Sequence, residues 1–299
     1  MCVDCIDGEG VCGYNVLMSL FTGKNLSLAP TVGAVIRRRN VSLLGGVKLL
    51  TGLGFEFVQL DLHLSGIRPW ELDARGRKDL LGKVGRCGAM ISGLDYFQSG
   101  DAFLSSDRID QTMARLIEAI GFARDLGGAE LSICLPLEGM SDEISGVIGE
   151  AAERYGTRVI THYEGDMARH VAWLKDLGCG FVRGGMDAGA CMGFGQKADQ
   201  AVHLYKALLG GGRLSDGFLN TGGGAGGSDG GSGGGGGGSR GRVCVGEGDL
   251  DVRGYRMGLE FSDGFVGPVV LSLNGLDDPL RGGEMGLRQW EAAGAIFGA

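Results

Sequence analysis

The sequence predicts a single α/β domain with the (β/α)8 fold, the TIM barrel. From residue 25 onward, short runs rich in β-forming residues alternate with longer amphipathic runs, eight of each. The length of 299 residues and the hydrophobic content of 43% fit one barrel with a substantial core. No Gly-x-Gly-x-x-Gly follows an early strand, which disfavours the rival arrangement, an open doubly wound sheet around a dinucleotide.

The expected elements follow each other as strand and helix along the chain. Strands are expected at Leu26–Ala29, Phe55–Leu60, Ala89–Leu94, Ala129–Leu135, Arg158–His162, Gly180–Met186, Arg213–Leu219 and Val266–Leu273. Helices are expected at Leu43–Leu53, Pro69–Cys87, Asp107–Leu126, Asp142–Tyr155, Asp166–Leu177, Lys197–Leu209, Val252–Leu259 and Glu284–Phe297. The clearest helix starts with a capping Asp107 and carries apolar residues at helical spacing. Eight such pairs imply parallel strands joined by right-handed crossovers, and eight strands close into a barrel.

Two segments stand apart from this alternation. Residues 1–24 are interpreted as a loose N-terminal extension and residues 25–299 as the barrel. Within the extension, Cys2, Cys5 and Cys12 lack the second Cys-x-x-Cys that would complete a four-ligand metal site. The chain has 61 glycines, and the Gly-rich segment 222–239 is expected to be a disordered loop because it cannot bury apolar surface. It follows the seventh strand at the catalytic rim, where a neutral expansion is favoured over a mobile lid.

The charge balance limits the class of partner. A net charge of −8 argues against a nucleic-acid surface, and the basic run Arg37–Arg39 is interpreted as a solvated edge. No window of eighteen apolar residues predicts a membrane span, and no secretory signal is recognised at the N-terminus. We therefore expect a cytoplasmic protein that binds a small molecule, with a homo-oligomer left open.

Polar side chains gather where the expected strands end. They are Asp61, His63, Asp95, Tyr96, Glu138, His162, Glu164, Asp187, Asp216, Asn220 and Asn274. In a barrel the chemistry lies at the carboxyl ends of the strands. Buried carboxylates there are costly unless they meet a cation, a hydroxyl group or a cationic side chain. Their clustering around one rim predicts a binding site.

The last part of the chain carries family-like motifs. Gly-Glu-Gly-Asp-Leu-Asp at 246–251 precedes a helix, and Gly-Phe-Val-Gly-Pro at 264–268 leads into the last strand. This unit resembles the closing strand–helix unit of the xylose isomerase-like TIM barrels, the sugar phosphate isomerase/epimerase superfamily. Gly-Gly-Met-Asp-Ala-Gly-Ala-Cys-Met at 184–192 resembles the family's Asp-Pro-(Ala/Gly)-(Asn/His)-Leu motif. The resemblance extends over roughly Ser27 to Phe297.

The resemblance implies a divalent metal, Mn²⁺, Mg²⁺ or Zn²⁺, held by Asp187. The family's other ligand positions fall on Thr161 in strand five, within Asp216–Thr221 in strand seven and on Ser272 in strand eight, so the usual ligand set is incomplete. Weak candidates for completing a metal site with Asp187 are Glu164, His162 and Asp216. We therefore expect weak divalent binding or none.

By resemblance, the chain is a sugar or sugar-phosphate isomerase/epimerase-like protein that binds a small polyhydroxylated ligand at the C-terminal rim. Glu164 and Asp187 are then the candidate catalytic residues, Glu164 as the base next to a carbonyl; His63, His162 and Asp95 are candidate ligand contacts. The alternative is a catalytically silent barrel that binds a carbohydrate or a protein partner. Endonuclease IV shares the fold, but four histidines and the acidic charge oppose a trinuclear zinc enzyme acting on DNA.

Overall fold

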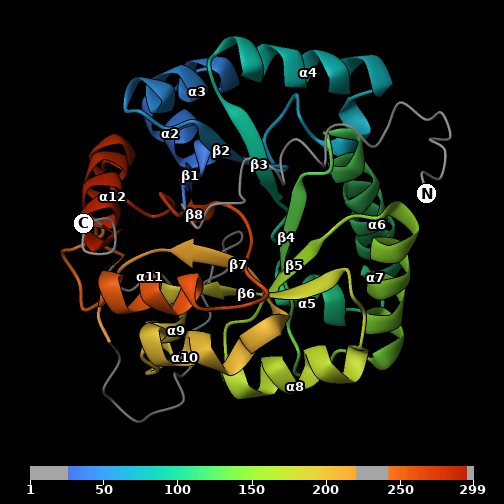
Figure 1. Ribbon diagram of the computed structural model, residues 1–299. Coiled ribbons are helices and arrows are strands. Elements are labelled where there is room, and N and C mark those ends of the chain that lie inside the picture. Colours follow the sequence, from blue (N-terminus) through green and yellow to red (C-terminus); the bar gives the residue numbers. More distant parts are fainter. Residues whose placement is uncertain (1–25, 220–241, 295–299) are drawn as a thin grey trace, which may run out of the picture.

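The chain forms a barrel of eight parallel strands surrounded by helices. The computed structural model describes residues 26–219 and 242–294. The strands follow the order β1-β8-β7-β6-β5-β4-β3-β2, and a parallel bridge between Thr31, just after β1, and Gln59 in β2 joins the two ends of the sheet. Figure 1 shows the helices arranged around the outside of this sheet. The predicted (β/α)8 fold is confirmed.

Strands and helices alternate along the chain as expected. The strands are β1 (Leu28–Pro30), β2 (Phe57–Asp61), β3 (Met90–Asp95), β4 (Glu130–Cys134), β5 (Val159–His162), β6 (Val182–Asp187), β7 (Leu209–Leu214) and β8 (Val269–Leu271). The helices are α2 (Val32–Arg39), α3 (Leu43–Gly52), α4 (Ala74–Arg86), α5 (Gly100–Leu104), α6 (Ile109–Asp125), α7 (Asp142–Tyr155), α8 (Met167–Leu177), α9 (Ala188–Gly193), α10 (Ala198–Tyr205), α11 (Val252–Glu260) and α12 (Pro279–Gly294). Of these, α2, α5 and α9 are helices that were not expected. Short 3-10 turns lie at Pro69–Glu71 and Lys206–Leu208.

Side-chain caps set the start of several helices. The carboxylate of Asp166 accepts a hydrogen bond from the backbone N–H of Ala168 at the start of α8, and Asp251 accepts one from Gly254 at the start of α11. Each cap satisfies one of the backbone donors that the first helical turn leaves unpaired. The apolar faces of these helices pack on the outer face of the sheet, where residues such as Leu131 are fully buried.

Glycines occupy inward positions on two adjacent strands of the barrel, β6 and β7. A Cβ on Gly185 in β6 would lie 2.5 Å from Cε1 of His162, and a Cβ on Gly211 in β7 would lie 2.6 Å from Cγ2 of Ile160. Both distances are too short for real contacts. The missing side chains leave the room into which the larger residues of neighbouring strands extend.

Strand seven is shifted from its expected place. It was expected at Arg213–Leu219, but β7 spans Leu209–Leu214. The reason is the run Gly210–Gly212, which has low intrinsic strand propensity but lies between β6 and β8, where side chains would collide with the neighbouring strands. The shift places Arg213 inside the barrel and Asp216 beyond the strand.

Helix α2 was not expected, and it changes the interpretation of the basic run. It ends at Asn40, which adopts a left-handed conformation with φ of 49°. Its last turn holds Arg38 and Arg39, which form ion pairs with Asp277 and Asp278 in the segment before α12. The basic run, expected to be a solvated edge, is therefore half-exposed and paired, and it joins the first and last parts of the barrel.

Three sequence expectations fall on parts of the chain outside the described residues. They are the loose extension at 1–24 with its cysteines, the disordered loop at 222–239, and the end of the last helix beyond Gly294. Within the described ranges, no helix is long and apolar enough to cross a membrane.

Candidate ligand site at the mouth of the barrel

A buried arginine lies at the centre of the carboxyl end of the barrel. Arg213, on β7, is 2% exposed, and its Nη2 donates a hydrogen bond to Oδ1 of Asp95 on β3 at 2.5 Å. The same carboxylate oxygen accepts a hydrogen bond from Nε2 of Gln59 at 2.9 Å. Cζ of Arg213 lies 4.9 Å from the centre of the Phe97 ring, a cation–π contact. Burial lowers the pKa of Arg213, but the Asp95 carboxylate outweighs burial and raises it, so this guanidinium stays charged.

Asp187, at the end of β6, is surrounded by donors. Its Oδ1 accepts hydrogen bonds from the Ser215 hydroxyl at 2.5 Å and from the backbone N–H of Ala190 at 3.1 Å. Its Oδ2 lies 3.4 Å from Nη2 of Arg242 and 4.0 Å from Nε of Arg213. Burial acts to raise the pKa of Asp187, but the two guanidinium groups, together with the hydrogen bonds from Ser215 and Ala190, outweigh burial and lower the pKa below its usual value. Asp187 is therefore an ionised carboxylate.

Arg242 connects the ends of β6 and β8, the two strands that flank β7 in the barrel. Its Nη1 donates a hydrogen bond to the hydroxyl of Ser272, just after β8, at 2.7 Å, while its Nη2 contacts Asp187. The Arg242 side chain is 28% exposed, so it forms part of the surface that a ligand would meet. Sequence reasoning missed this residue; the only signal is its position, four residues before the Gly-Glu-Gly-Asp loop.

His162 is the inward-facing residue at the end of β5. It is 7% exposed, and its ring meets the Phe97 ring edge-on at 5.7 Å between centres. Burial and the positive charge of Arg213 lower the pKa of His162 to about 3, so the imidazole is neutral near pH 7. Its neighbour Thr161 points the other way, because the Thr161 hydroxyl pairs with Nε2 of His170 on α8 at 2.9 Å. The family position assigned to Thr161 therefore lies outside the barrel interior.

Glu164 lies at the rim beyond His162. Glu164 is exposed to solvent. Partial desolvation of its carboxyl group and the nearby Asp187 carboxylate nevertheless raise the pKa of Glu164, and the positive charge of Arg242 acts to lower it. Cys134 at the end of β4 is influenced by the same two carboxylates: burial, Glu164 and Asp187 raise its pKa to about 12. Cys134 is therefore a protonated thiol. We call Asp95, His162, Asp187, Arg213, Arg242 and Ser272 the mouth cluster, with Glu164 at its edge.

Two other candidate residues have different surroundings. The His63 ring stacks on Tyr96 at 5.3 Å between centres, and its Nε2 lies 2.9 Å from the carbonyl oxygen of Phe97. His63 therefore lies beside the mouth cluster, linked to it through Phe97. The two oxygens of Asp216 accept four backbone N–H hydrogen bonds at 2.8–3.1 Å, from Gly217, Gly246, Gly248 and Leu250. Asp216 thus holds the Gly-Glu-Gly-Asp loop in place.

Two further strand-end residues, Asp61 and Asn274, pair with an arginine away from the cluster. Arg37 of α2 donates hydrogen bonds to Asp61 at 3.0 Å and to Asn274 at 2.9 Å. These contacts tie β2 to the segment that follows β8. Asp61 and Asn274 therefore close the barrel at the rim.

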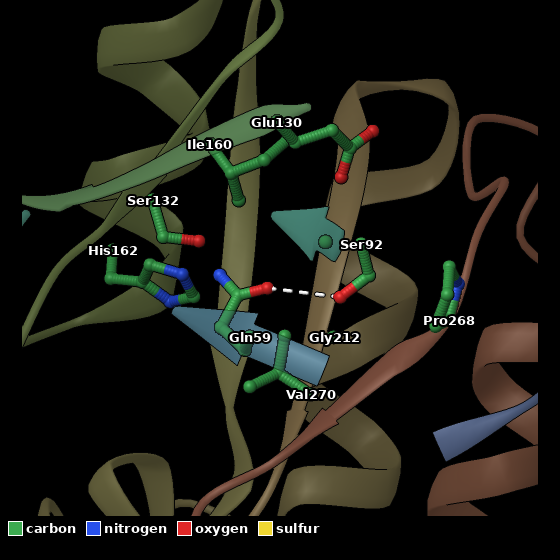
Figure 2. A pocket seen from close by; sticks show the side chains of 10 residues that line it. Gln59, Ser92, Glu130, Ser132, Ile160, His162, Gly212, Pro268 and Val270 are labelled. Atoms are coloured by element: carbon green, nitrogen blue, oxygen red, sulfur yellow. Dashed lines mark hydrogen bonds between the residues drawn. The ribbon is translucent and has the colours of Figure 1, made fainter. Parts of the chain in front are cut away.

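Below the mouth cluster the barrel contains a small polar cavity. Gln59, Ser92, Ser132 and His162 are among the residues that line it, and Figure 2 shows the Ser92 hydroxyl bonded to the Gln59 amide oxygen. The space open to the centre of a water molecule is about 20 Å³, enough for one water. The cavity therefore cannot hold a sugar, and a ligand must bind above it, at the mouth.

The residues do not fit a divalent metal. Among the described residues, no group of three or more His, Cys, Asp or Glu side chains comes together in a way that could hold a metal ion. Of the four weak candidates, Asp216 is occupied by backbone donors and Asp187 by two guanidinium groups. A dication at Asp187 would lie beside two positive charges.

Comparison with solved structures shows which TIM barrels this chain resembles. No protein-family model and no curated protein matches the sequence. Among solved structures, D-psicose 3-epimerase with D-tagatose from Clostridium cellulolyticum H10 superposes with a TM-score of 0.66 at 12% identity, covering 90% of this chain and 99% of that one. A xylose isomerase domain protein from Alicyclobacillus acidocaldarius gives 0.65 at 13% identity, covering 91% and 99%.

A xylose isomerase-like TIM barrel/4-hydroxyphenylpyruvate dioxygenase fusion protein gives a TM-score of 0.63 at 12% identity, covering 91% of this chain. The chain spans 44% of that fusion protein. The protein therefore has the fold of the xylose isomerase-like TIM barrels. The solved structures that it resembles include a sugar epimerase.

Proposed function

We propose that this chain binds a small polyhydroxylated, sugar-like molecule at the mouth cluster. One observation carries the proposal: two buried nitrogens of the cluster, Nδ1 of His162 and Nε of Arg213, have no hydrogen-bond partner among the described residues. A buried polar atom left unpaired costs about 1–3 kcal/mol. A ligand with several hydroxyl groups offers oxygens that accept from Arg213 and, for either tautomer, pair with His162.

The chemistry proposed for this site is that of a sugar isomerase or epimerase: removal of a proton next to a carbonyl. Glu164 is the candidate base, because its pKa is raised and it lies at the solvent-facing edge of the cluster. Asp187, His162, Asp95 and the neighbouring His63 are the candidate ligand contacts. The fold shared with sugar epimerases supports this assignment.

A second candidate, binding without turnover, is favoured by the state of Asp187. Both of its carboxylate oxygens are engaged by donors of the chain itself, which leaves little capacity for proton transfer. In this case the cluster would recognise a carbohydrate, and Glu164 would contribute charge only.

The experiment combines a binding measurement with an exchange measurement. The melting temperature is recorded with and without millimolar D-tagatose or D-psicose; a ligand that binds only the folded state raises it. The rise should be lost in Asp187→Asn and kept in His203→Ala, a matched change of an exposed histidine on α10. No shift with either sugar, for wild-type protein that is folded by circular dichroism, would contradict the proposal.

Proton NMR of the same sugars in D₂O then separates the two candidates. Deuterium incorporation next to the carbonyl, abolished in Glu164→Gln, supports isomerase or epimerase chemistry. Binding without incorporation supports the silent barrel.

A further inference from the structure

The mouth cluster contains its own positive charge. Arg213 and Arg242 both approach Oδ2 of Asp187, at 4.0 and 3.4 Å. Arg213 is anchored by Asp95 and by the Phe97 ring, while Arg242 is anchored by Ser272. The two guanidinium groups are therefore both held beside the same carboxylate oxygen.

Arg242 lies between the two strand ends that the resemblance assigns to metal ligands. One end of its guanidinium contacts Asp187 after β6, and the other contacts Ser272 after β8. Ser272 is a neutral hydroxyl where a carboxylate is expected, and a guanidinium donor pairs with it at a normal hydrogen-bond distance of 2.7 Å. The serine at the expected metal-ligand position and the guanidinium of Arg242 are therefore directly hydrogen-bonded to each other.

We propose that the guanidinium of Arg242, supported by Arg213, takes the place of a divalent cation, so that the mouth cluster binds its ligand without a metal. This inference rests on the proposed sugar-binding function and names the group that meets the ligand's oxygens. Arg242 is the more exposed of the two arginines, and its N–H groups are donors suited to a carbonyl or hydroxyl oxygen.

The charge balance agrees with this arrangement. Within the mouth cluster, the carboxylates of Asp95 and Asp187 face the guanidinium groups of Arg213 and Arg242, two charges of each sign. A dication added beside Asp187 would have no uncompensated carboxylate of the cluster to attract it, and it would be repelled by two neighbouring cations. The cluster is thus complete without a metal.

The test is a calorimetric titration with MnCl₂ on EDTA-treated protein, with no sugar present. Wild-type protein should show no stoichiometric binding, whereas Arg242→Ala/Ser272→Glu should bind Mn²⁺ at least about tenfold more tightly, because a cation is removed and a carboxylate is added. Arg253→Ala is the matched control, since it removes an exposed arginine of α11, and it should behave as wild type.

Two results would overturn the inference. One is a tight, stoichiometric Mn²⁺ site in wild-type protein that disappears in Asp187→Ala. The other is an unchanged Mn²⁺ affinity in the folded double variant. If the double variant does not fold, Arg242→Ala alone serves, and its Mn²⁺ affinity should still rise above that of Arg253→Ala. Because no sugar is used, failure of sugar binding would contradict the proposed function without affecting this result.

Discussion

Arg213 on β7 reaches across the inside of the barrel to Asp95 on β3, with Nη2 2.5 Å from Oδ1. The two residues are separated by 118 positions in sequence, and both are almost fully buried. The pair thus couples distant parts of the barrel at the level where the ligand is proposed to bind. We therefore expect substitution of Arg213 to change both stability and the proposed ligand binding.

The first prediction concerns this pair. Arg213→Met should lower the free energy of unfolding by about 3–5 kcal/mol, because it leaves the buried carboxylates of Asp95 and Asp187 without their shared cation. Urea unfolding followed by circular dichroism measures the loss. Arg253→Ala should change the free energy by less than about 0.5 kcal/mol. A loss below about 1 kcal/mol in Arg213→Met would show that the pair contributes little.

The second prediction concerns the loop held by Asp216. Asp216→Ala removes the acceptor of four backbone N–H hydrogen bonds and should lower the free energy of unfolding by at least about 2 kcal/mol. It should also weaken sugar binding, because the loop follows directly after Arg242. Asp263→Ala, a change of an exposed aspartate after α11, is the control. Equal stability of the two variants would contradict the structural role of Asp216.

The third prediction concerns pH. Burial lowers the pKa of both His162 and His170 from 6.5 to about 3, so the unfolded chain binds more protons than the folded chain between these values. The free energy of unfolding should therefore fall as the pH drops below about 6.5, by up to about 1.4 kcal/mol per pH unit for each histidine. Burial of Glu130 raises its pKa to about 6, so the folded chain binds this proton more tightly than the unfolded chain. Between about pH 6 and 4.5 this effect cancels the loss of stability caused by about one histidine.

Urea unfolding at several pH values tests this balance. His162→Gln should remove about one histidine's share of the pH dependence, whereas His203→Gln, on the exposed side of α10, should leave it unchanged. A wild-type protein whose stability is constant or rises from pH 6.5 to 5 would show that these histidines are not held in their neutral form.

The fourth prediction concerns the ligand's charge. Because the two guanidinium groups of the mouth cluster already face carboxylates, the cluster has no spare cation for a phosphate group. D-Fructose should therefore bind at least about tenfold more tightly than D-fructose 6-phosphate, a difference of about 1.4 kcal/mol. Isothermal titration at two salt concentrations measures both affinities. Tighter binding of D-fructose 6-phosphate, weakened by salt, would contradict this prediction, because it would require an unpaired cation near the cluster.

The sequence was sufficient to predict the fold because the alternation of strand and helix patterns depends on local residue types. The polar residues at the ends of apolar strands also included Asp95, His162 and Asp187, which the structure brings together in the mouth cluster. All the catalytic and ligand roles, the homo-oligomer and the cytoplasmic location stay predictions, as does the absence of nucleic-acid binding.

The sequence did not predict the arginines of the mouth cluster. Arg213 lies in a strand whose three glycines carry almost no local strand signal, so its pairing is decided by β6 and β8. The alternation within a four-residue strand also decides whether Thr161 or His162 faces inward, and a shift of one residue reverses the answer. Contacts between distant parts of the chain fixed both features.

Metal-independent sugar binding through Arg242 is tested most directly by a calorimetric titration of EDTA-treated protein with D-tagatose and D-psicose, repeated after adding Mn²⁺. We expect that the sugar binds in the absence of metal, that Mn²⁺ leaves the Kd unchanged, and that Arg242→Ala weakens binding at least about tenfold. Sugar binding that appears only when Mn²⁺ is present, and that is unaffected by Arg242→Ala, would contradict this expectation.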